Sequence, residues 1–290
     1  MIWGIRPIKK TDMKKILLSI AFAIFTLTLF AQTSNLPFKA GEKIDVTLHY
    51  KWGISADIAT LSFNLQQVNN AGSPNYHILL NVRTNRFFDS FYKVRDVYES
   101  KFDSNLDPVY AMRDVHEGNF AARNEYTWSA DKKTLYAKVE KNTMPAPVDT
   151  SFTSKETIRD IINMIYTIRT LDINSLKAGK PATLLVAMDR NITRATISYL
   201  RNEVKQVDAL GKFNAVCLTM TLKNVSHVEK EESKVVVPTG DDVKNMVYIW
   251  LSDDQNRLPL FISVPISVGK MEIRANNIEN VKYPLTSKVK

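Results

Sequence analysis

The segment from Arg83 to Asp96 carries the most distinctive combination of side chains in the sequence. It reads RTNRFFDSFYKVRD, with four aromatic and four cationic side chains in fourteen residues. Aromatic rings can hold the chain of an amphiphile while cations hold its head group, so this composition indicates the mouth of a ligand pocket. The alternative, which the sequence favours, is structural: the rings fill the core and Arg95 pairs with Asp96 or another acid. The candidate ligand-binding residues are Trp52, Arg83, Arg86, Phe87, Phe88, Phe91, Tyr92 and Arg95.

The spacing of the four histidines matches no metal-binding or catalytic motif. His49, His77, His116 and His227 have no second histidine or cysteine at the spacing of metal ligands, so we expect no metal and no cofactor. His49 and His77 fall on the polar side of alternating strands, which predicts that both are exposed. A Ser-His-Asp triad stays open as an alternative because its members assemble in space, although the sequence has no Gly-x-Ser-x-Gly elbow.

Acidic pairs are the other candidates for chemistry. Asp241-Asp242 and Asp253-Asp254 could act as paired carboxylates, but glycosidase carboxylates are defined by a separation in space that a sequence does not give. The second pair resembles part of a calcium loop, yet it lacks the central glycine and the later glutamate of such loops. A turn built from Asp and Asn is the better interpretation. The sequence therefore favours a protein without catalytic activity.

The elements that position these residues are mostly β-strands. Apolar residues alternate with polar ones over residues 44–52, 59–65 and 76–82, and similar patterns return after residue 172. Short, turn-like connections such as residues 69–75 favour antiparallel neighbours. We therefore expect a mainly β fold, with a large antiparallel sheet that is curved or a barrel-like meander.

One helical insert is predicted around residues 155–171. Five isoleucines from Ile158 to Ile168 recur at helical spacing and form one apolar stripe, which we expect to pack against the sheet. Thr153 and Glu156 match a capping box at the start of this helix. Cys217 is the only cysteine, and its apolar surroundings in the sequence predict a buried free thiol.

The first 31 residues have the features of a cleavable export signal. An uncharged apolar run over residues 16–30 follows two lysines, and it is shorter than the ~20 residues that cross a bilayer. Met13 is the predicted start of translation. The mature chain is then soluble and periplasmic or otherwise exported, and meets the membrane only through the transient signal. The leader holds five of the 39 basic and one of the 30 acidic residues, so the net charge falls from +9 to +5 and we expect no nucleic-acid partner.

Two groups of short motifs lie near the two ends of the mature chain. The first comprises FKAGEK at 38–43, YKW at 50–52 and FYKVRDVYES at 91–100, and the second comprises WLSDD at 250–254, RLP at 257–259 and VGK at 268–270. Together they resemble the DUF3108 family of bacterial exported proteins, and the end of the signal resembles those of Bacteroidetes. The resemblance implies an envelope location and a β-rich fold, and it supplies no catalytic residues. It also implies that the Arg95-Asp96 and Asp253-Asp254 turns belong to the family's architecture.

The sequence leads to three functional hypotheses. Residues 32–290 form one β-rich domain, or two lobes over 36–150 and 172–290. We expect a non-catalytic envelope protein whose concave sheet binds a lipid or another apolar ligand, because curved sheets and barrels commonly hold such ligands. The alternatives are a module that docks on an envelope protein or glycan, and a hydrolase with a spatially assembled site. The sequence does not define the oligomeric state.

Overall fold

The computed structural model describes residues 35–70, 73–225, 246–266 and 268–289, and the statements below concern these residues. The predicted signal over residues 1–31, with its start at Met13, lies outside them, as does Asp241-Asp242. The chain divides into two units, Met1–Asn35 and Leu36–Lys290, and the fold described here is that of the second.

Alternating strands dominate this unit, as the sequence pattern predicts. The first half of the chain contributes β1 (Lys43–Trp52), β2 (Ile54–Asn64), β3 (Gln66–Asn70), β4 (Ser73–Thr84), β5 (Arg95–Asp103), β6 (Pro108–Glu117), β7 (Phe120–Trp128), β8 (Thr134–Lys141) and β9 (Val148–Thr153). The second half contributes β10 (Ile158–Arg159), β11 (Ala182–Met188), β12 (Asn191–Val207), β13 (Gly211–Asn224), β14 (Val247–Ser252), β15 (Pro259–Pro265) and β16 (Lys270–Glu279).

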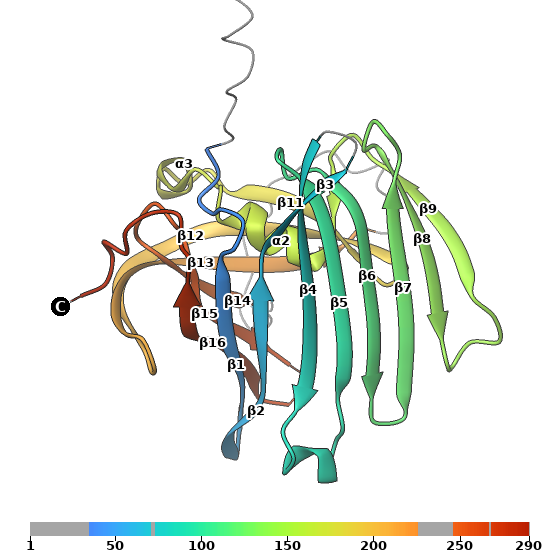
Figure 1. Cartoon of the computed structure of the whole chain (residues 1–290), viewed down its shortest axis with the longest axis horizontal. Coiled ribbons are helices and arrows are strands. Elements are labelled where there is room, and N and C mark those ends of the chain that lie inside the picture. The colour runs from blue at the N-terminus through green and yellow to red at the C-terminus, as the bar shows by residue number, and fades with distance from the viewer. Residues whose placement is uncertain (1–34, 71–72, 226–245, 267, 290) are drawn as a thin grey trace, which may run out of the picture. The chain divides into compact units, whose positions relative to one another are not determined.

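All sixteen strands belong to one sheet (Figure 1). The order along it is β10-β11-β12-β13-β14-β15-β16-β1-β2-β4-β5-β6-β7-β8-β9, with β3 paired only to β4. The pairing of β1 with β16 joins the two halves of the chain, so residues 36–150 and 172–290 share one sheet. The expected mainly β, curved and barrel-like fold is confirmed. One pair of strands departs from the antiparallel arrangement, because β10 and β11 run parallel.

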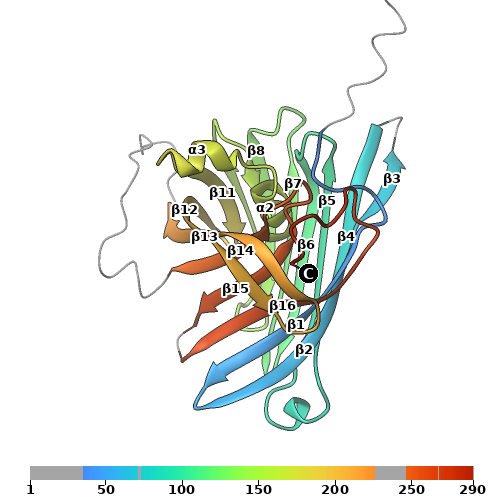
Figure 2. The ribbon, with the colours of Figure 1, turned by 90° about the vertical axis from the view of Figure 1, so that its left-hand side faces the viewer.

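The sheet curves strongly (Figure 2), and its edge strands β9 and β10 form no hydrogen-bonded ladder with each other. The edge strands β9 and β10 are separated by only residues 154–157. Side chains bridge the junction: the indole nitrogen of Trp128 donates to the carbonyl oxygen of Ile158 at 2.8 Å. A hydrophobic cluster packs β6–β8 against β10–β12 through Ala111, Tyr126, Leu135, Ala137, Ile158, Leu185, Ala187 and Ile192. In a closed barrel, the two edge strands would be joined by backbone hydrogen bonds. Here, packing of side chains takes the place of those hydrogen bonds.

Helix α2 (Ile161–Ile168) fills the interior of the curved sheet, and the shorter α3 (Ile173–Lys177) follows it. The apolar stripe is confirmed in part: Ile162 and Ile168 are buried in the hydrophobic clusters, Ile161 and Ile165 are partly buried, and Ile158 lies in β10 and not in the helix. The predicted capping box is wrong. Asp160 is the N-cap, and its Oδ1 accepts from the backbone nitrogens of Ile162 and Asn163 at 2.9 and 3.0 Å. Residues 158–159 pair as a strand instead, so the helix starts later than the isoleucine pattern indicates.

A buried ion pair fastens the C-terminal end of α2. The Arg169 guanidinium and the Glu42 carboxylate form two bonds of 2.5 and 2.8 Å, and both residues are almost fully buried. Arg169 also donates to the carbonyl oxygen of Asn256 at 2.9 Å, and its guanidinium lies 5.0 Å from the ring centre of Phe38. The pair thereby links the start of β1, the end of α2 and the β14–β15 turn.

The predicted burial of Cys217 is confirmed, whereas the predicted exposure of His49 is wrong. Cys217 is a free and fully buried thiol, as predicted, and burial raises its pKa to about 11. His49 was expected to be exposed, but it is only 7% exposed because Asp57 and Ser55 hold both of its ring nitrogens. His77 is half-buried beside Glu99.

We predict that Arg169→Met destabilises the protein by about 3–5 kcal/mol in urea unfolding, because it leaves the Glu42 carboxylate buried without a partner. The double variant Glu42→Met/Arg169→Met should recover much of this loss, since no buried charge is then left unpaired. Arg123→Ala is the control, because that side chain is 44% exposed between Asp114 and Glu125 and its loss should cost under about 1 kcal/mol. Equal losses in Arg169→Met and Arg123→Ala would contradict the assigned role.

Candidate functional site

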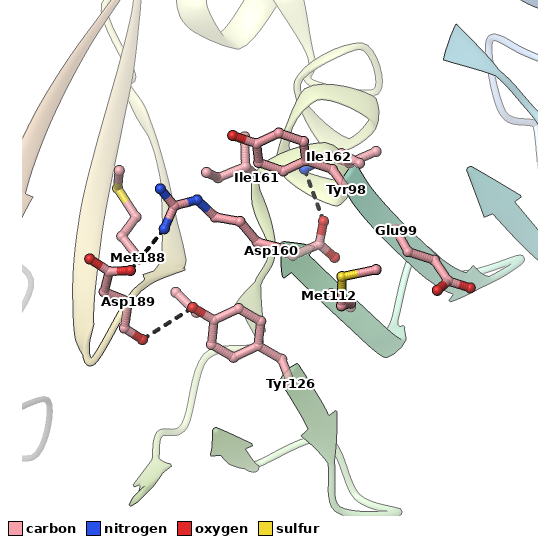
Figure 3. A pocket seen from close by; sticks show the side chains of 12 residues that line it. Tyr98, Glu99, Met112, Tyr126, Asp160, Ile161, Ile162, Met188 and Asp189 are labelled. Atoms are coloured by element: carbon pink, nitrogen blue, oxygen red, sulfur yellow. Dashed lines mark hydrogen bonds and ion pairs between the residues drawn. The ribbon is translucent and has the colours of Figure 1, made fainter. Parts of the chain in front are cut away.

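A cavity of about 240 Å³ lies inside the curved sheet, where β5–β7 face the β11–β12 end of the sheet and the start of α2 (Figure 3). Cross-strand pairing places four of its residues on one face: Tyr98 lies opposite Arg113, and Ala111 lies opposite Tyr126. The lining residues are Tyr98, Glu99, Ala111, Met112, Arg113, Tyr126, Asp160, Ile161, Ile162, Ala187, Met188 and Asp189.

Apolar side chains make up most of the cavity wall. Ile161 and Ile162 come from the first turn of α2, and Met188 comes from the end of β11. Two buried alanines, Ala111 and Ala187, leave the space open, because larger side chains at these positions would project into it. Met188 is 39% exposed, so this end of the cavity reaches the surface.

A polar cluster around Asp189 forms the other part of the wall. One carboxylate oxygen accepts from Arg113 at 2.9 Å and from Asn124 at 2.8 Å, and the other accepts from Lys141 at 2.9 Å. The Tyr126 hydroxyl donates to the Asp189 carbonyl oxygen at 3.1 Å. Burial works to raise the pKa of Asp189, but these donors and the charge of Arg113 outweigh it and hold the pKa below its usual range.

Arg113 and Lys141 both pair with the one carboxylate of Asp189, and Glu117 and Asp96 also act on Arg113. A guanidinium has five N–H donors, and its bond to Asp189 engages one of them. Arg113 can therefore bind an anionic or strongly polar group while staying paired. The left-handed backbone of Asp189, with φ of 55°, lets the tight β11–β12 turn direct both its carboxylate and its carbonyl oxygen toward β6 and β7.

Asp160 is the second acid of the cavity and is 6% exposed. Besides capping α2, it accepts a hydrogen bond from the Ser100 hydroxyl of β5 at 2.9 Å, which ties the helix to the sheet. Burial raises the pKa of Asp160 to about 6, because the four hydrogen-bond donors around it do not fully replace water around the ionised form. Glu99 is committed elsewhere, since its carboxylate accepts from His77 and Lys101 at 2.9 and 2.8 Å.

The ligand-binding residues predicted from the sequence lie elsewhere. None of the eight is among the cavity's lining residues. Arg83, Arg86, Phe87, Phe88, Phe91, Tyr92 and Arg95 lie in and beside the β4–β5 connection, at the lower end of the sheet in Figure 1, and Trp52 ends β1. The structure thus gathers five of them on one loop and places Arg83 and Arg95 on the strands that flank it, and their predicted role in ligand binding stays a prediction.

The structural alternative for this segment is wrong for the aromatic rings, but Arg95 does pair with another acid, as that alternative allowed. Phe87, Phe91 and Tyr92 are 67%, 74% and 53% exposed, so they do not fill the core. Arg95 pairs with Asp89 and not with Asp96, whose carboxylate accepts instead from the backbone nitrogen of His116 at 3.0 Å. Alternation along β5 places Arg95 and Asp96 on opposite faces, which is why neighbours in sequence do not pair.

A second polar arrangement lies on the β1–β2 hairpin. Nδ1 of His49 is 2.6 Å from Oδ1 of Asp57, and Nε2 is 2.8 Å from Oγ of Ser55. These are the contacts of a Ser-His-Asp triad. The Asp57 side chain is 66% exposed, however, and water screens its charge. The described residues contain no group of three or more His, Cys, Asp or Glu side chains that could hold a metal ion.

Sequence reasoning missed the cavity residues because each occupies an ordinary position in a strand or turn. Arg113, Tyr126 and Asp189 are separated by up to 76 residues and meet only through strand pairing and sheet curvature. One signal was available for Asp160, since an aspartate directly before an isoleucine-rich helical pattern is a typical N-cap.

The fold and the cavity define the class of this protein: an open, barrel-like β-sheet with a helix inside it and a small amphiphilic cavity beside that helix. The chain matches the family model described as "Protein of unknown function (DUF3108)" over residues 45–275 and belongs to that family. A search of curated proteins gave no match.

Solved structures support the fold. The chain is similar to the crystal structure of a beta-barrel-like protein of domain of unknown function DUF1849 from Brucella abortus, with a TM-score of 0.52 and 8% identity over 83% of this chain and 98% of that one. At this identity the likeness concerns the fold alone. In the part of the chain that the structure describes, helices long and apolar enough to cross a membrane are absent.

We predict that Asp160 makes the protein less stable as the pH rises from about 4 to about 6. Its folded-state pKa, about 6, lies above the ordinary value of 3.8, so the folded state binds the proton more tightly and loses this advantage on ionisation. Asp160→Asn keeps the cap acceptor without the titration. Its unfolding free energy should therefore gain about 2–3 kcal/mol relative to wild type between pH 4 and 7.

Urea unfolding at each pH measures this difference. Asp96, whose pKa burial also raises to about 6, contributes equally to both proteins and cancels in the comparison. Parallel stability profiles for the wild type and Asp160→Asn would show that the Asp160 carboxyl does not titrate in this range.

Proposed function

We propose that this chain is an exported, non-catalytic envelope protein that binds a lipid-like amphiphile in the cavity inside its sheet. The observation that carries the proposal is the cavity's two-part wall. Ile161, Ile162 and Met188 offer an apolar surface, and the Arg113–Asp189 pair offers a polar one. An amphiphile matches both parts, with its chain against the isoleucines and its head group at Arg113.

The size of the cavity supports a compact ligand or one end of a longer one. Apolar cavities of about 150 Å³ hold benzene, so about 240 Å³ is enough for a short aliphatic chain. Small-molecule sites commonly start at ~300 Å³, so a longer chain would have to extend past Met188 to the surface. The export signal predicted over residues 1–31 supports a location where such molecules are abundant.

Two variants test this site. Ala111→Phe would place a ring in the cavity, and Arg113→Met would remove the cation at its polar end. We expect calorimetric titration with octanoate to show at least tenfold weaker binding for each variant than for the wild type. Val109→Phe, on the exposed part of the same strand, is the matched control and should bind as the wild type does. Arg113→Met keeps the test valid if the phenylalanine variant does not fold.

Native mass spectrometry of the protein purified from its own envelope gives an independent readout. A co-purified amphiphile that is absent from Ala111→Phe supports the proposal. The proposal fails if the wild type carries no small molecule and binds octanoate no better than Ala111→Phe does.

The contacts of His49 favour a second candidate function, ester hydrolysis with Ser55 as nucleophile. His49 would accept the serine proton, and Asp57 would orient the imidazole. We place this candidate below ligand binding because Asp57 is exposed. Water weakens the electrostatic interaction by which a carboxylate orients the imidazole.

Hydrolysis of p-nitrophenyl acetate and labelling by a fluorophosphonate test the second candidate. If Ser55 is a nucleophile, Ser55→Ala abolishes labelling and His49→Gln lowers the rate about 10²–10⁴-fold, the usual contribution of a general base. Ser90→Ala, which changes another exposed serine, is the control. Equal rates in all three variants would rule out catalysis by this triad.

A further inference from the structure

The β4–β5 connection forms a rigid aromatic projection, which we call the aromatic loop and define as residues 85–94. It contains the short 3-10 helix η2 (Phe88–Ser90) and lies at the lower end of the sheet in both views (Figures 1 and 2). The β6–β7 turn lies beside it, because the Gly118 nitrogen donates to the Lys93 carbonyl oxygen at 2.8 Å.

Three phenylalanines form a cluster at the tip of the aromatic loop. The ring centres of Phe87 and Phe88 and those of Phe87 and Phe91 are both 5.3 Å apart. Phe87 and Phe91 are nonetheless the two most exposed large apolar side chains among the described residues, at 67% and 74%. Exposed apolar groups gathered in one patch indicate an interaction surface, whereas the same groups scattered singly do not.

Hydrogen bonds hold the loop in this conformation. The Asn85 side-chain oxygen accepts from the backbone nitrogens of Phe87 and Phe88, both at 3.1 Å. Asp89 accepts from Arg95 at 2.9 Å and from the Thr84 hydroxyl at 2.6 Å. The aromatic tip is therefore preorganised, so that binding through it costs little conformational entropy.

The charge around the tip is positive. Asp89, the loop's only acid, is neutralised by Arg95. Arg83, Arg86 and Lys93 are exposed, and within the described residues none of them takes part in an ion pair closer than 4 Å. Three uncompensated cations thus surround an exposed aromatic cluster.

Tyr92 adds an amphipathic side chain beside this cluster. It is 53% exposed, and its ring lies over Gly118, where a Cβ atom would be only 3.0 Å from the ring. Tyrosine is favoured at membrane–water interfaces because its ring is apolar and its hydroxyl group can stay hydrated. Two further apolar side chains, Ile266 and Val268, lie between β15 and β16, the strand that pairs with β1, and are 42% and 47% exposed.

We propose that the aromatic loop docks this protein on an anionic lipid bilayer, with the phenylalanine tip in the interface and Arg83, Arg86 and Lys93 at the head groups. Rings that enter the acyl boundary, with flanking cations at the phosphates, are the features of reversible interfacial anchors. A bilayer fits this tip better than a protein partner does, because the loop projects from the end of the sheet (Figure 1) and its residues line neither the cavity beside α2 nor the two open hollows over β6–β9. The proposal goes beyond the ligand cavity and does not depend on it.

Vesicle co-sedimentation tests the proposal on the protein expressed as the full chain and purified from the envelope. We expect binding to phosphatidylcholine vesicles that contain 30% phosphatidylglycerol, and weak binding to phosphatidylcholine alone. Phe87→Ser/Phe91→Ser should lower the partition coefficient at least tenfold. Arg86→Gln/Lys93→Gln should lower it about fivefold per cation removed, and 0.5 M NaCl should mimic the charge variant.

Leu79→Ser/Tyr136→Ser is the matched control, because it removes two exposed apolar side chains outside the loop and should leave vesicle binding unchanged. The proposal is overturned if the phenylalanine variant sediments with vesicles as the wild type does, if the control variant loses binding equally, or if the wild type retains a protein partner but no vesicles. Octanoate binding should persist in Phe87→Ser/Phe91→Ser, and vesicle binding should persist in Ala111→Phe, so the two proposals can fail separately.

Discussion

The buried ion pair between Arg169 and Glu42 is the interaction on which the rest of the structure depends. It joins the first strand, the end of α2 and the β14–β15 turn, which are far apart in the sequence. Burying an unpaired charge costs free energy. Conformations that separate Arg169 from Glu42 in the interior are therefore disfavoured, and the pair selects this arrangement of the three segments. The turn is fixed further by Asp254, which accepts from Ser252, Asn256 and Ser287.

Helix α2 is consequently held at both ends. Arg169 fixes its C-terminal end, and Asp160 fixes its N-terminal end to Ser100 of β5. Where the two edges meet, side chains of the strands pack in place of a last ladder of hydrogen bonds. Helix α2 fills the interior elsewhere, through Ile162, Met164 and Ile168. The cavity lies in the space that remains beside the first turn of α2, and the polar cluster of Asp189 lines its other part.

Two surfaces with different physical character result from this arrangement. The cavity is internal, and its charges are paired: Asp189 holds Arg113 and Lys141. The aromatic loop is external, and its cations are unpaired among the described residues. An internal site selects a ligand by shape and by a few polar contacts, whereas an exposed, cationic aromatic tip suits an extended anionic surface. The two proposed functions therefore depend on different residues of the same fold.

The sequence by itself determined the strands, the buried thiol of Cys217 and the apolar face of α2, because these follow from alternation and helical spacing within short segments. It also identified the segment from Arg83 to Arg95 as unusual, but it favoured burial of aromatic rings that the structure exposes. The Thr153–Glu156 cap was wrong, and the sequence left open whether Arg95 pairs with Asp96 or with another acid, since local patterns do not show which residues a neighbouring strand engages. Only the tertiary structure decided that Asp160 caps α2, that Arg113 meets Asp189 and that His49 is buried between Ser55 and Asp57. Those contacts depend on strand register and on the curvature of the whole sheet, which are set by long-range pairing and not by neighbouring residues.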